Sequence, residues 1–323
     1  MIFREENTMR RFIMDCDTGG DDASAIVLAI ASNDIELLGV TACMGNLPLY
    51  QTYRNARELL HYIGIPNVPV LKGSEDPLVR GNWVGTREER YLPVEGITRE
   101  VIDEVDMDAV EWMAKTLRES EEKITLIPLA PLTNIAKLMF AYPDLVKEKV
   151  DEIIIMGGGM YFGNTTGAAE LNIYADPEAA QAVFSFGTPV VMCGLDVCYN
   201  SYITGAENQK IREIGNKVAN VFASVTQRSL DYAAKGGKTP DRALMYDSVP
   251  VIYALYPEIF KTVTCSVEVE CGSELCDGMT VCEPENQWGH YWSKAPRIHK
   301  VVLDVDREAY IEALYKILNE SEY

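Results

Sequence analysis

Short runs of Ile, Val and Leu alternate with helical patterns over the first 200 residues, and this alternation constrains the fold more than any other feature. Several runs, such as EIIIM at 152–156, are apolar throughout, as expected of strands that are covered by helices on both faces. Such a chain is expected to adopt an α/β fold with a single open, mostly parallel, doubly wound sheet flanked by helices. We expect strands at 11–14, 35–43, 68–71, 124–129, 152–156 and 189–192, and helices at 21–32, 49–63, 107–120, 132–140 and 177–186.

The remainder of the chain has a different pattern. Residues 204–245 favour helix followed by a Gly-Gly loop, and Asp247 precedes an apolar helical segment, SVPVIYALY. Residues 262–305 alternate like strands and predict a C-terminal hairpin region, after which 307–319 favour a closing helix. The polar stretch 72–99 lacks periodicity, and a loop of that length is usually functional, often as a lid. Without a repeat or a low-complexity linker, we predict one domain over residues 1–323.

Composition excludes several classes of partner. Lys and Arg total 29 against 49 for Asp and Glu, which gives a formal net charge of −20. A surface this negative repels phosphate backbones and anionic lipid, so we expect neither nucleic acid nor a membrane as partner. The apolar runs fall well short of the ~20 residues of a membrane span, and the N-terminus carries charges where a signal peptide would be apolar. We therefore expect a cytoplasmic protein.

Four carboxylates fall within eight residues in the segment IMDCDTGGDDASA at 13–25: Asp15, Asp17, Asp21 and Asp22. They lie where a strand ends, a Gly-Gly turn follows and a helix begins. Two carboxylates ~5 Å apart repel by about 3 kcal/mol at an effective dielectric near 20, so the cluster needs a counter-charge. Ligands that are all oxygen suit Ca²⁺ or Mg²⁺. Solvated helix-capping acids are the simpler alternative, but they would account for only one or two of the four.

A second enzyme class begins in a similar way. The pattern DxDxT after a strand also opens the haloacid-dehalogenase phosphotransferases, in which the first Asp is the nucleophile and the second the acid–base catalyst. Asp15, Asp17 and Thr18 fit that short pattern. The Gly-Gly-Asp-Asp continuation straight into a helix fits it less well, so this phosphatase remains the weaker alternative.

A longer match is more specific. The segment DCDTGGDDASAI resembles the N-terminal fingerprint of the inosine–uridine-preferring nucleoside hydrolases, DxDxxxDD. Similar segments follow in the family's order: VTACMGN at 40–46, ITLIPLAPLTNIA at 124–136, MGGGMYFGNTTGAAELNIYADPEAA at 156–180 and MYDSVPVIYAL at 245–255. The resemblance spans nearly the whole chain. It implies an open α/β fold, a tightly bound Ca²⁺, cleavage of the N-glycosidic bond of ribonucleosides, and a homodimer or homotetramer.

The resemblance also implies roles for individual residues. Asp17 matches the carboxylate that ligates Ca²⁺ and takes a proton from the attacking water, and Asp15 matches a supporting position beside the metal. Asp22 matches a bidentate ligand. The backbone carbonyl of Leu129 and the carboxylate of Asp247 match the remaining protein ligands. Taken alone, Asp247 would be interpreted as the N-cap of the following helix.

Five further residues match the ribose-binding set of the family: Asp21, Asn46, Asn164, Glu170 and Asn172. Sugar hydroxyls both donate and accept hydrogen bonds, which suits amide and carboxylate side chains. Both Asn46 and Asn164 follow a glycine, so a plain turn role is an equally good interpretation of their chemistry. Asp176 precedes Pro177 and is interpreted as a helix N-cap outside the site.

The sequence departs from the family pattern on the side of the base. One branch has His immediately before the final Asp and another has Trp, whereas this chain has Tyr246, and none of its three histidines stands in a matching position. An aromatic ring there can stack on a base, and Trp83 in the polar loop is its expected partner, unless Trp83 simply packs on the body. Because the leaving-group acid is missing, a Ca²⁺-dependent nucleoside- or ribose-binding protein without turnover stands as the alternative to a hydrolase.

Overall fold

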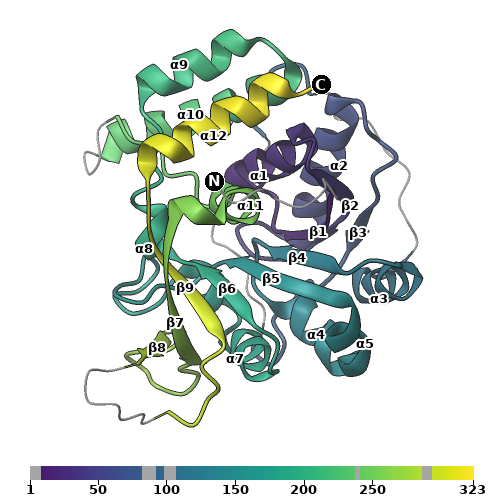
Figure 1. Cartoon of the computed structure of the whole chain (residues 1–323), viewed down its shortest axis with the longest axis vertical. Helices are drawn as coiled ribbons and strands as arrows, with labels where there is room; N and C mark the ends of the chain where they lie inside the picture. Colours follow the sequence, from purple (N-terminus) through teal and green to yellow (C-terminus); the bar gives the residue numbers. More distant parts are fainter. Residues whose placement is uncertain (1–8, 82–91, 98–106, 237–240, 286–292) are drawn as a thin grey trace.

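One sheet of nine strands runs through the part of the chain that the computed structural model describes, residues 9–81, 92–97, 107–236, 241–285 and 293–323 (Figure 1). Its strands follow the order β3-β2-β1-β4-β5-β6-β9-β7-β8. They are β1 (Arg10–Cys16), β2 (Ile35–Ala42), β3 (Val70–Lys72), β4 (Ile124–Pro128), β5 (Val150–Met156), β6 (Val190–Cys193), β7 (Phe260–Val269), β8 (Thr280–Pro284) and β9 (His299–Val305).

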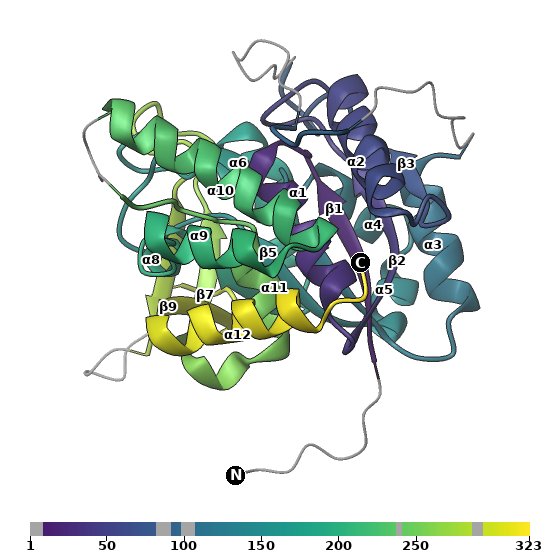
Figure 2. The ribbon, with the colours of Figure 1, turned by 90° about the horizontal axis from the view of Figure 1, so that it is seen from above.

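Two helical layers cover the sheet (Figures 1 and 2). One layer contains α1 (Gly20–Ala31), α2 (Leu49–Ile63), α9 (Gly205–Ile214), α10 (Lys217–Gly236), α11 (Ser248–Leu255) and α12 (Arg307–Glu320). The opposite layer contains α3 (Ala109–Glu119), α4 (Thr133–Ala141), α5 (Pro143–Lys149) and α7 (Pro177–Ser185). Two short helices, α6 (Leu171–Ala175) and α8 (Leu195–Cys198), follow the carboxyl ends of β5 and β6.

The connectivity confirms the predicted doubly wound α/β fold. Strands β1 to β6 are all parallel, and their order reverses between β1 and β4. In open α/β sheets, ligands bind outside the carboxyl ends of the strands at this reversal point. The predicted C-terminal hairpin, β7 and β8, extends the same sheet, because β9 pairs with β6 in parallel and with β7 in antiparallel fashion.

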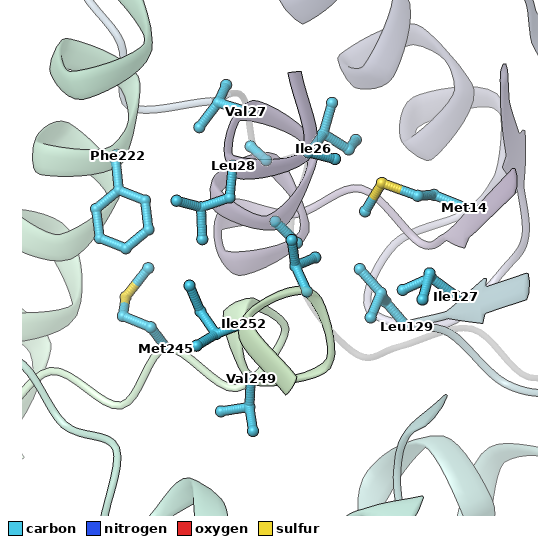
Figure 3. Close-up of a cluster of buried hydrophobic side chains, with 14 of the residues drawn as sticks. Met14, Ile26, Val27, Leu28, Ile127, Leu129, Phe222, Met245, Val249 and Ile252 are labelled. Carbon is cyan, nitrogen blue, oxygen red and sulfur yellow. The ribbon is translucent and has the colours of Figure 1, made fainter. Parts of the chain in front are cut away.

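The core explains why the strands are apolar on both faces. On β1, Phe12 and Met14 pack into the cluster beneath α1 and α11, whereas Ile13 packs into the cluster beneath α3 and α4. In Figure 3, side chains from β1, β4, α1, α10 and α11 meet around Leu28 and Ile252. This packing fixes the carboxyl ends of β1 and β4 relative to the start of α1.

Some elements differ from the sequence prediction. The segment 204–245 forms two helices, α9 and α10, and helices α5, α6 and α8 were not predicted. The last two contain only five and four residues, too few for a 3.6-residue period to show. Trp83 lies outside the described residues. Among those described, no helix is long and apolar enough to cross a membrane.

Candidate active site

Asp15 stands near the carboxyl end of β1 and is fully enclosed. Its Oδ1 accepts hydrogen bonds from Thr41 Oγ1 at 2.5 Å and from Asn134 Nδ2 at 2.8 Å. Its Oδ2 has no hydrogen-bond partner among the described residues. Burial raises the pKa of Asp15 to about 7, against the lowering effect of those two hydrogen bonds. The side chain is thus held at the carboxyl end of β1 by two neighbouring elements, β2 and α4.

Asp17 follows β1 and is held by the loop after β2. Its carboxylate accepts hydrogen bonds from the backbone N–H of Asn46 and from Asn46 Nδ2. A Cβ at position 45 would lie 2.1 Å from Asp17 Oδ2, so the loop reaches the carboxylate only because residue 45 is glycine. Burial and the neighbouring Asp22 raise the pKa of Asp17. The structure thus brings Asp17 and Asn46, two residues that the sequence analysis assigned to the site separately, into direct contact.

Asp22 lies in the first turn of α1, where its carboxylate closes the strand–turn–helix segment. It accepts hydrogen bonds from the backbone N–H groups of Asp17 and Gly19, at 3.1 Å and 3.0 Å. Carboxylate oxygens of Asp21, Asp22 and Asp247 lie within 4.8 Å of one another. Asp247 occupies the N-cap position of α11 but makes no capping hydrogen bond. The residue taken alone suggested a helix cap, but its carboxylate lies with those of Asp21 and Asp22, and we refer to these three side chains as the acidic group.

These carboxylates have the electrostatics of a cation site. Asp17, Asp22 and Asp247 are at most 3% exposed. In the part of the chain that the structure describes, no Lys or Arg forms an ion pair with any of them. Burial raises the pKa of Asp247, and repulsion from Asp21 and Asp22 raises it further. Buried charges are normally paired or bound to metal, so the donor set fits a hard cation.

Of the residues predicted to bind ribose, Asp21 lies in α1 and Asn46 in the loop after β2, whereas Asn164, Glu170 and Asn172 lie between β5 and the first turn of α6. Asn172 Nδ2 donates to the carbonyls of Leu129 and Met156, at 3.0 Å and 3.1 Å. The buried Glu170 is the N-cap of α6 and also accepts from the backbone N–H of Gly158 at 3.0 Å. Asn164 is exposed, and its Oδ1 accepts from the N–H of Leu171 at 3.0 Å. The chain fold thus brings the Leu129 carbonyl, Glu170 and Asn172 together.

Tyr246 places an aromatic side chain beside the acidic group. It is half-buried against the core and immediately precedes Asp247. Burial raises the pKa of its phenol, and the charges of Tyr199, Asp21 and Glu170 raise it as well. Tyr199 itself packs edge to face against Phe162, with ring centroids 5.2 Å apart. Tyr246 is thus near enough to Asp21 and Glu170 for their charges to act on its phenol.

Neither of the two described histidines, His61 and His299, lies in the acidic group, where an acid for the leaving base would be needed. His61 lies in the last turn of α2. His299 is buried on β9, where its Nδ1 accepts from the N–H of Val190. His290 and Trp83 lie outside the described residues, so the predicted pairing of Trp83 with Tyr246 stays a prediction.

Comparison with known proteins decides the family. The sequence model of one family, the inosine–uridine preferring nucleoside hydrolases, matches residues 12–312 of this chain. The chain belongs to this family. Its activity is hydrolysis of ribonucleosides. Members of the family bind a metal ion, which agrees with the acidic group of Asp21, Asp22 and Asp247.

Individual relatives cover almost the whole nucleoside hydrolase chain. The pyrimidine-specific ribonucleoside hydrolase RihA of Klebsiella pneumoniae is 38% identical over 304 residues, which cover 94% of this chain and 96% of the relative. A plant nucleoside hydrolase has the same fold, with a TM-score of 0.85 and 27% identity over 97% of this chain and 99% of its own. A purine-preferring ribonucleoside hydrolase from Gardnerella vaginalis also reaches 0.85, at 25% identity, covering 96% of this chain and 98% of its own.

Family membership removes the alternatives that the sequence left open. A nucleoside hydrolase is an enzyme, so the binding protein without turnover loses its support. The phosphotransferase alternative required Asp15 as nucleophile. The match to the nucleoside hydrolase family over residues 12–312 gives that alternative no support.

Two residues of this nucleoside hydrolase site were missed from the sequence. Thr41 and Asn134 hold Asp15, and Asn134 Oδ1 in turn accepts from the N–H and hydroxyl of Ser74, each at 2.8 Å. Thr41 is a buried polar residue near the carboxyl end of β2, and Asn134 follows Thr133 at the start of α4. Polar side chains at the carboxyl end of a buried strand are the signal that could have identified Thr41.

The raised carboxyl pKa values predict an unusual pH dependence of stability for the metal-free enzyme. With a folded-state pKa of about 7, Asp15 and Asp22 bind more protons in the folded chain than in the unfolded chain between about pH 4 and 7. The free energy of unfolding therefore falls as pH rises through this window. We expect the melting temperature of chelated protein to be several degrees higher at pH 5.5 than at pH 8.

Surface charge also changes over this pH range, so the matched control is the same protein with saturating Ca²⁺. A bound cation keeps its carboxylate ligands ionised while the surface charges remain the same. The drop between pH 5.5 and pH 8 should therefore be smaller when Ca²⁺ is present. An equal drop in both forms, by differential scanning fluorimetry, would contradict the assignment of the effect to the buried carboxylates.

Proposed function

We propose that this nucleoside hydrolase binds Ca²⁺ through Asp17, Asp22, Asp247 and the backbone carbonyl of Leu129, and that Asp17 accepts the proton of the attacking water. The observation that carries the proposal is that Asp17, Asp22 and Asp247 are buried and form no ion pair with Lys or Arg among the described residues, at the switch point of the sheet. An all-oxygen donor set favours Ca²⁺ over softer metals. When bound, Ca²⁺ would orient the sugar hydroxyls and lower the pKa of a water molecule.

The residues of the chain then have separate tasks. Asp17, oriented by Asn46, takes one proton from water as the water oxygen forms a bond to C1′. The C1′–N bond breaks with its electron pair leaving on the base. The sugar becomes oxocarbenium-like in the transition state, so the carboxylates around it stabilise the developing positive charge. Asp15 does not react in this scheme, because its hydrogen bonds to Thr41 and Asn134 make it a support.

Ribose recognition is assigned to Asp21, Asn46, Asn164, Glu170 and Asn172. Their carboxylates accept from sugar hydroxyls, and their amides donate and accept. Asp21 lies within 4.8 Å of the proposed metal ligands Asp22 and Asp247, which supports contact with hydroxyls that also face the cation. Asn172 Nδ2 donates to the Leu129 carbonyl, which is a proposed metal ligand, and Glu170 is the N-cap of the same helix, α6.

We propose pyrimidine ribonucleosides as the preferred substrates. The support is the 38% identity over nearly the full length to a hydrolase that is named pyrimidine-specific, against 25% to one that is named purine-preferring. The test is a hydrolysis panel of uridine, cytidine, inosine, adenosine, guanosine and nicotinamide riboside, with p-nitrophenyl riboside as a substrate whose leaving group needs no acid. Faster release of inosine or adenosine than of uridine and cytidine would overturn this base assignment.

Tyr246 is proposed to contact the base with its ring. Tyr246→Ala should lower kcat/KM for the best natural nucleoside by about 30-fold, the scale of one stacking contact together with its burial. Tyr246→Phe keeps the ring and should stay within about threefold of the parent. Cleavage of p-nitrophenyl riboside should change less than nucleoside cleavage in both variants. If Tyr246→Phe loses as much activity as Tyr246→Ala, the hydroxyl and not the ring is the important group.

Assembly and location stay predictions. A homodimer or homotetramer is expected from the family resemblance alone, and light scattering of the purified protein distinguishes these states from a monomer. The cytoplasmic location is likewise an expectation from the sequence.

A further inference from the structure

The segment between β5 and α6 carries two residues of the proposed ribose site, Asn164 and Glu170, and leads directly into a third, Asn172, the second residue of α6. It begins with a sharp turn at Gly157–Gly159, in which Gly158 has a φ of +75°. A Cβ at Gly158 would lie 2.8 Å from Met192 Sδ and about 3 Å from the side chain of Thr280. The turn is therefore enclosed by β6 and β8, and its conformation depends on the contacts that these and other neighbouring elements make with its backbone.

Four consecutive backbone N–H groups in this turn donate to side chains. Gly158 N donates to Glu170 Oε2 at 3.0 Å, within the segment itself. Gly159 N donates to Thr280 Oγ1 at 3.0 Å, and the same hydroxyl donates to the Gly159 carbonyl at 2.7 Å. Met160 N and Tyr161 N donate to the two oxygens of Asp196, at 2.7 Å and 3.3 Å. The last two anchors come from β8 and α8.

We infer that Thr280 and Asp196 are positioning residues for ribose binding, which rests on the proposed assignment of Asn164, Glu170 and Asn172. Both side chains are buried, at 2% and 7% exposure, and each binds two backbone groups of the turn. The α8 backbone adds a third contact, because Leu195 N donates to the Gly158 carbonyl at 2.9 Å. The C-terminal hairpin thereby acts on the substrate site although its strands lie at the far edge of the sheet.

The physical argument concerns what happens when an anchor is lost. The Thr280 hydroxyl is both donor and acceptor to one residue, so its removal leaves the buried N–H and carbonyl of Gly159 without this partner. An unsatisfied buried polar group is unfavourable, and a turn relieves it by shifting toward water or toward another partner. Because Asn164 and Glu170 lie on the same segment, such a shift displaces groups that are proposed to bind the sugar.

The first test compares Thr280→Val with Thr280→Ser in the full-length, Ca²⁺-loaded enzyme. Valine keeps the shape and removes the hydroxyl, and it should lower kcat/KM for the best nucleoside by about tenfold. Serine keeps the hydroxyl and should stay within about threefold of the parent. The matched control is Thr125→Val, the same change at a 3% exposed position on β4, where the hydroxyl accepts from Arg10 Nη2. That position is at the amino end of the strand, away from the site, so the control should keep its kcat/KM.

A double-mutant cycle separates positioning from general destabilisation. If Thr280 acts through the turn, Thr280→Val should cost less than about threefold in an Asn164→Ala background, because the group that it helps to place is already absent. Should Thr280→Val fail to fold, Asp196→Asn provides the same cycle, since its amide would face the N–H groups of Met160 and Tyr161 with only one acceptor. A full tenfold loss in both backgrounds would overturn the inference and leave only a structural role.

The outcomes also separate this inference from the proposed site. If Asn164→Ala lowers kcat/KM while folded Thr280→Val and Asp196→Asn do not, the ribose assignment stands and the positioning role is overturned. If Asn164→Ala, Glu170→Gln and Asn172→Ala all keep parental kcat/KM, the ribose assignment itself fails and the inference falls with it.

Discussion

Replacing Asp17 by asparagine should lower kcat by at least about 10³-fold while the fold is retained. Asparagine has nearly the same volume and can still interact with Asn46, but it cannot take a proton from water. Loss of a general base costs about 10²–10⁴ in rate, and a weakened metal site adds to that loss. Steady-state hydrolysis of uridine and p-nitrophenyl riboside measures the effect, and circular dichroism checks the fold.

The control is the same chemical change at a distant acid. Asp144→Asn alters an exposed carboxylate on α5 in the opposite helical layer and should leave kcat unchanged. Asp17→Asn should also be slow with p-nitrophenyl riboside, because water must be deprotonated whatever leaves. A near-parental rate in folded Asp17→Asn would overturn the assignment of the base.

Removing the metal should abolish most of the activity and destabilise the protein. At pH 8, chelation leaves the buried carboxylates of Asp17, Asp22 and Asp247 to repel one another without a counter-ion. We expect kcat/KM to fall by at least about 100-fold, the scale of losing an activated water. Ca²⁺ at 100 times its dissociation constant should stabilise the folded state by about 2.7 kcal/mol, which thermal unfolding detects.

Variants and other metals identify the ion and its ligands. Asp22→Asn and Asp247→Asn should weaken Ca²⁺ binding in calorimetry, whereas Asp144→Asn should not. Mg²⁺ should restore less activity than Ca²⁺, because it demands a stricter octahedral geometry and keeps its waters. Full activity in protein shown by elemental analysis to be free of metal would refute the proposed role of the ion.

Much of the fold could be predicted from the sequence because its signals are local. The apolar runs of β1, β2, β4 and β5 and the periodicity of α1 and α2 each lie within a short window, so their types and approximate bounds agree with the structure. The short helices α6 and α8 could not be predicted in this way. Glu170 caps α6, and the backbone N–H of Leu195, at the start of α8, donates to the carbonyl of Gly158 on a distant segment.

The candidate site divides in the same manner. The acidic fingerprint at Asp15–Asp22 is contiguous, so the sequence alone predicted that carboxylates gather at a strand–helix junction and would need a counter-charge. Asp247 is more than 200 residues away, and its own chemistry suggested only a helix cap. The family resemblance implied that it joins the site, and the structure places its carboxylate beside Asp21 and Asp22 without a capping hydrogen bond. The hydrogen bonds from Thr41 and Asn134 to Asp15 likewise join three elements that are separate along the chain, β2, α4 and β1.

The sequence by itself determined the strand–helix alternation, the acidic fingerprint and the family resemblance. Each of these depends on which residues are close along the chain, where side-chain period, charge density and motif spacing are explicit. Only the tertiary structure decided which distant side chains share a site. The order of β1 and β4, the approach of Gly45 to Asp17 and the contact of Thr280 with Gly159 depend on how packed layers bring chain segments together. Long-range packing of this kind leaves no periodic signal in a single sequence.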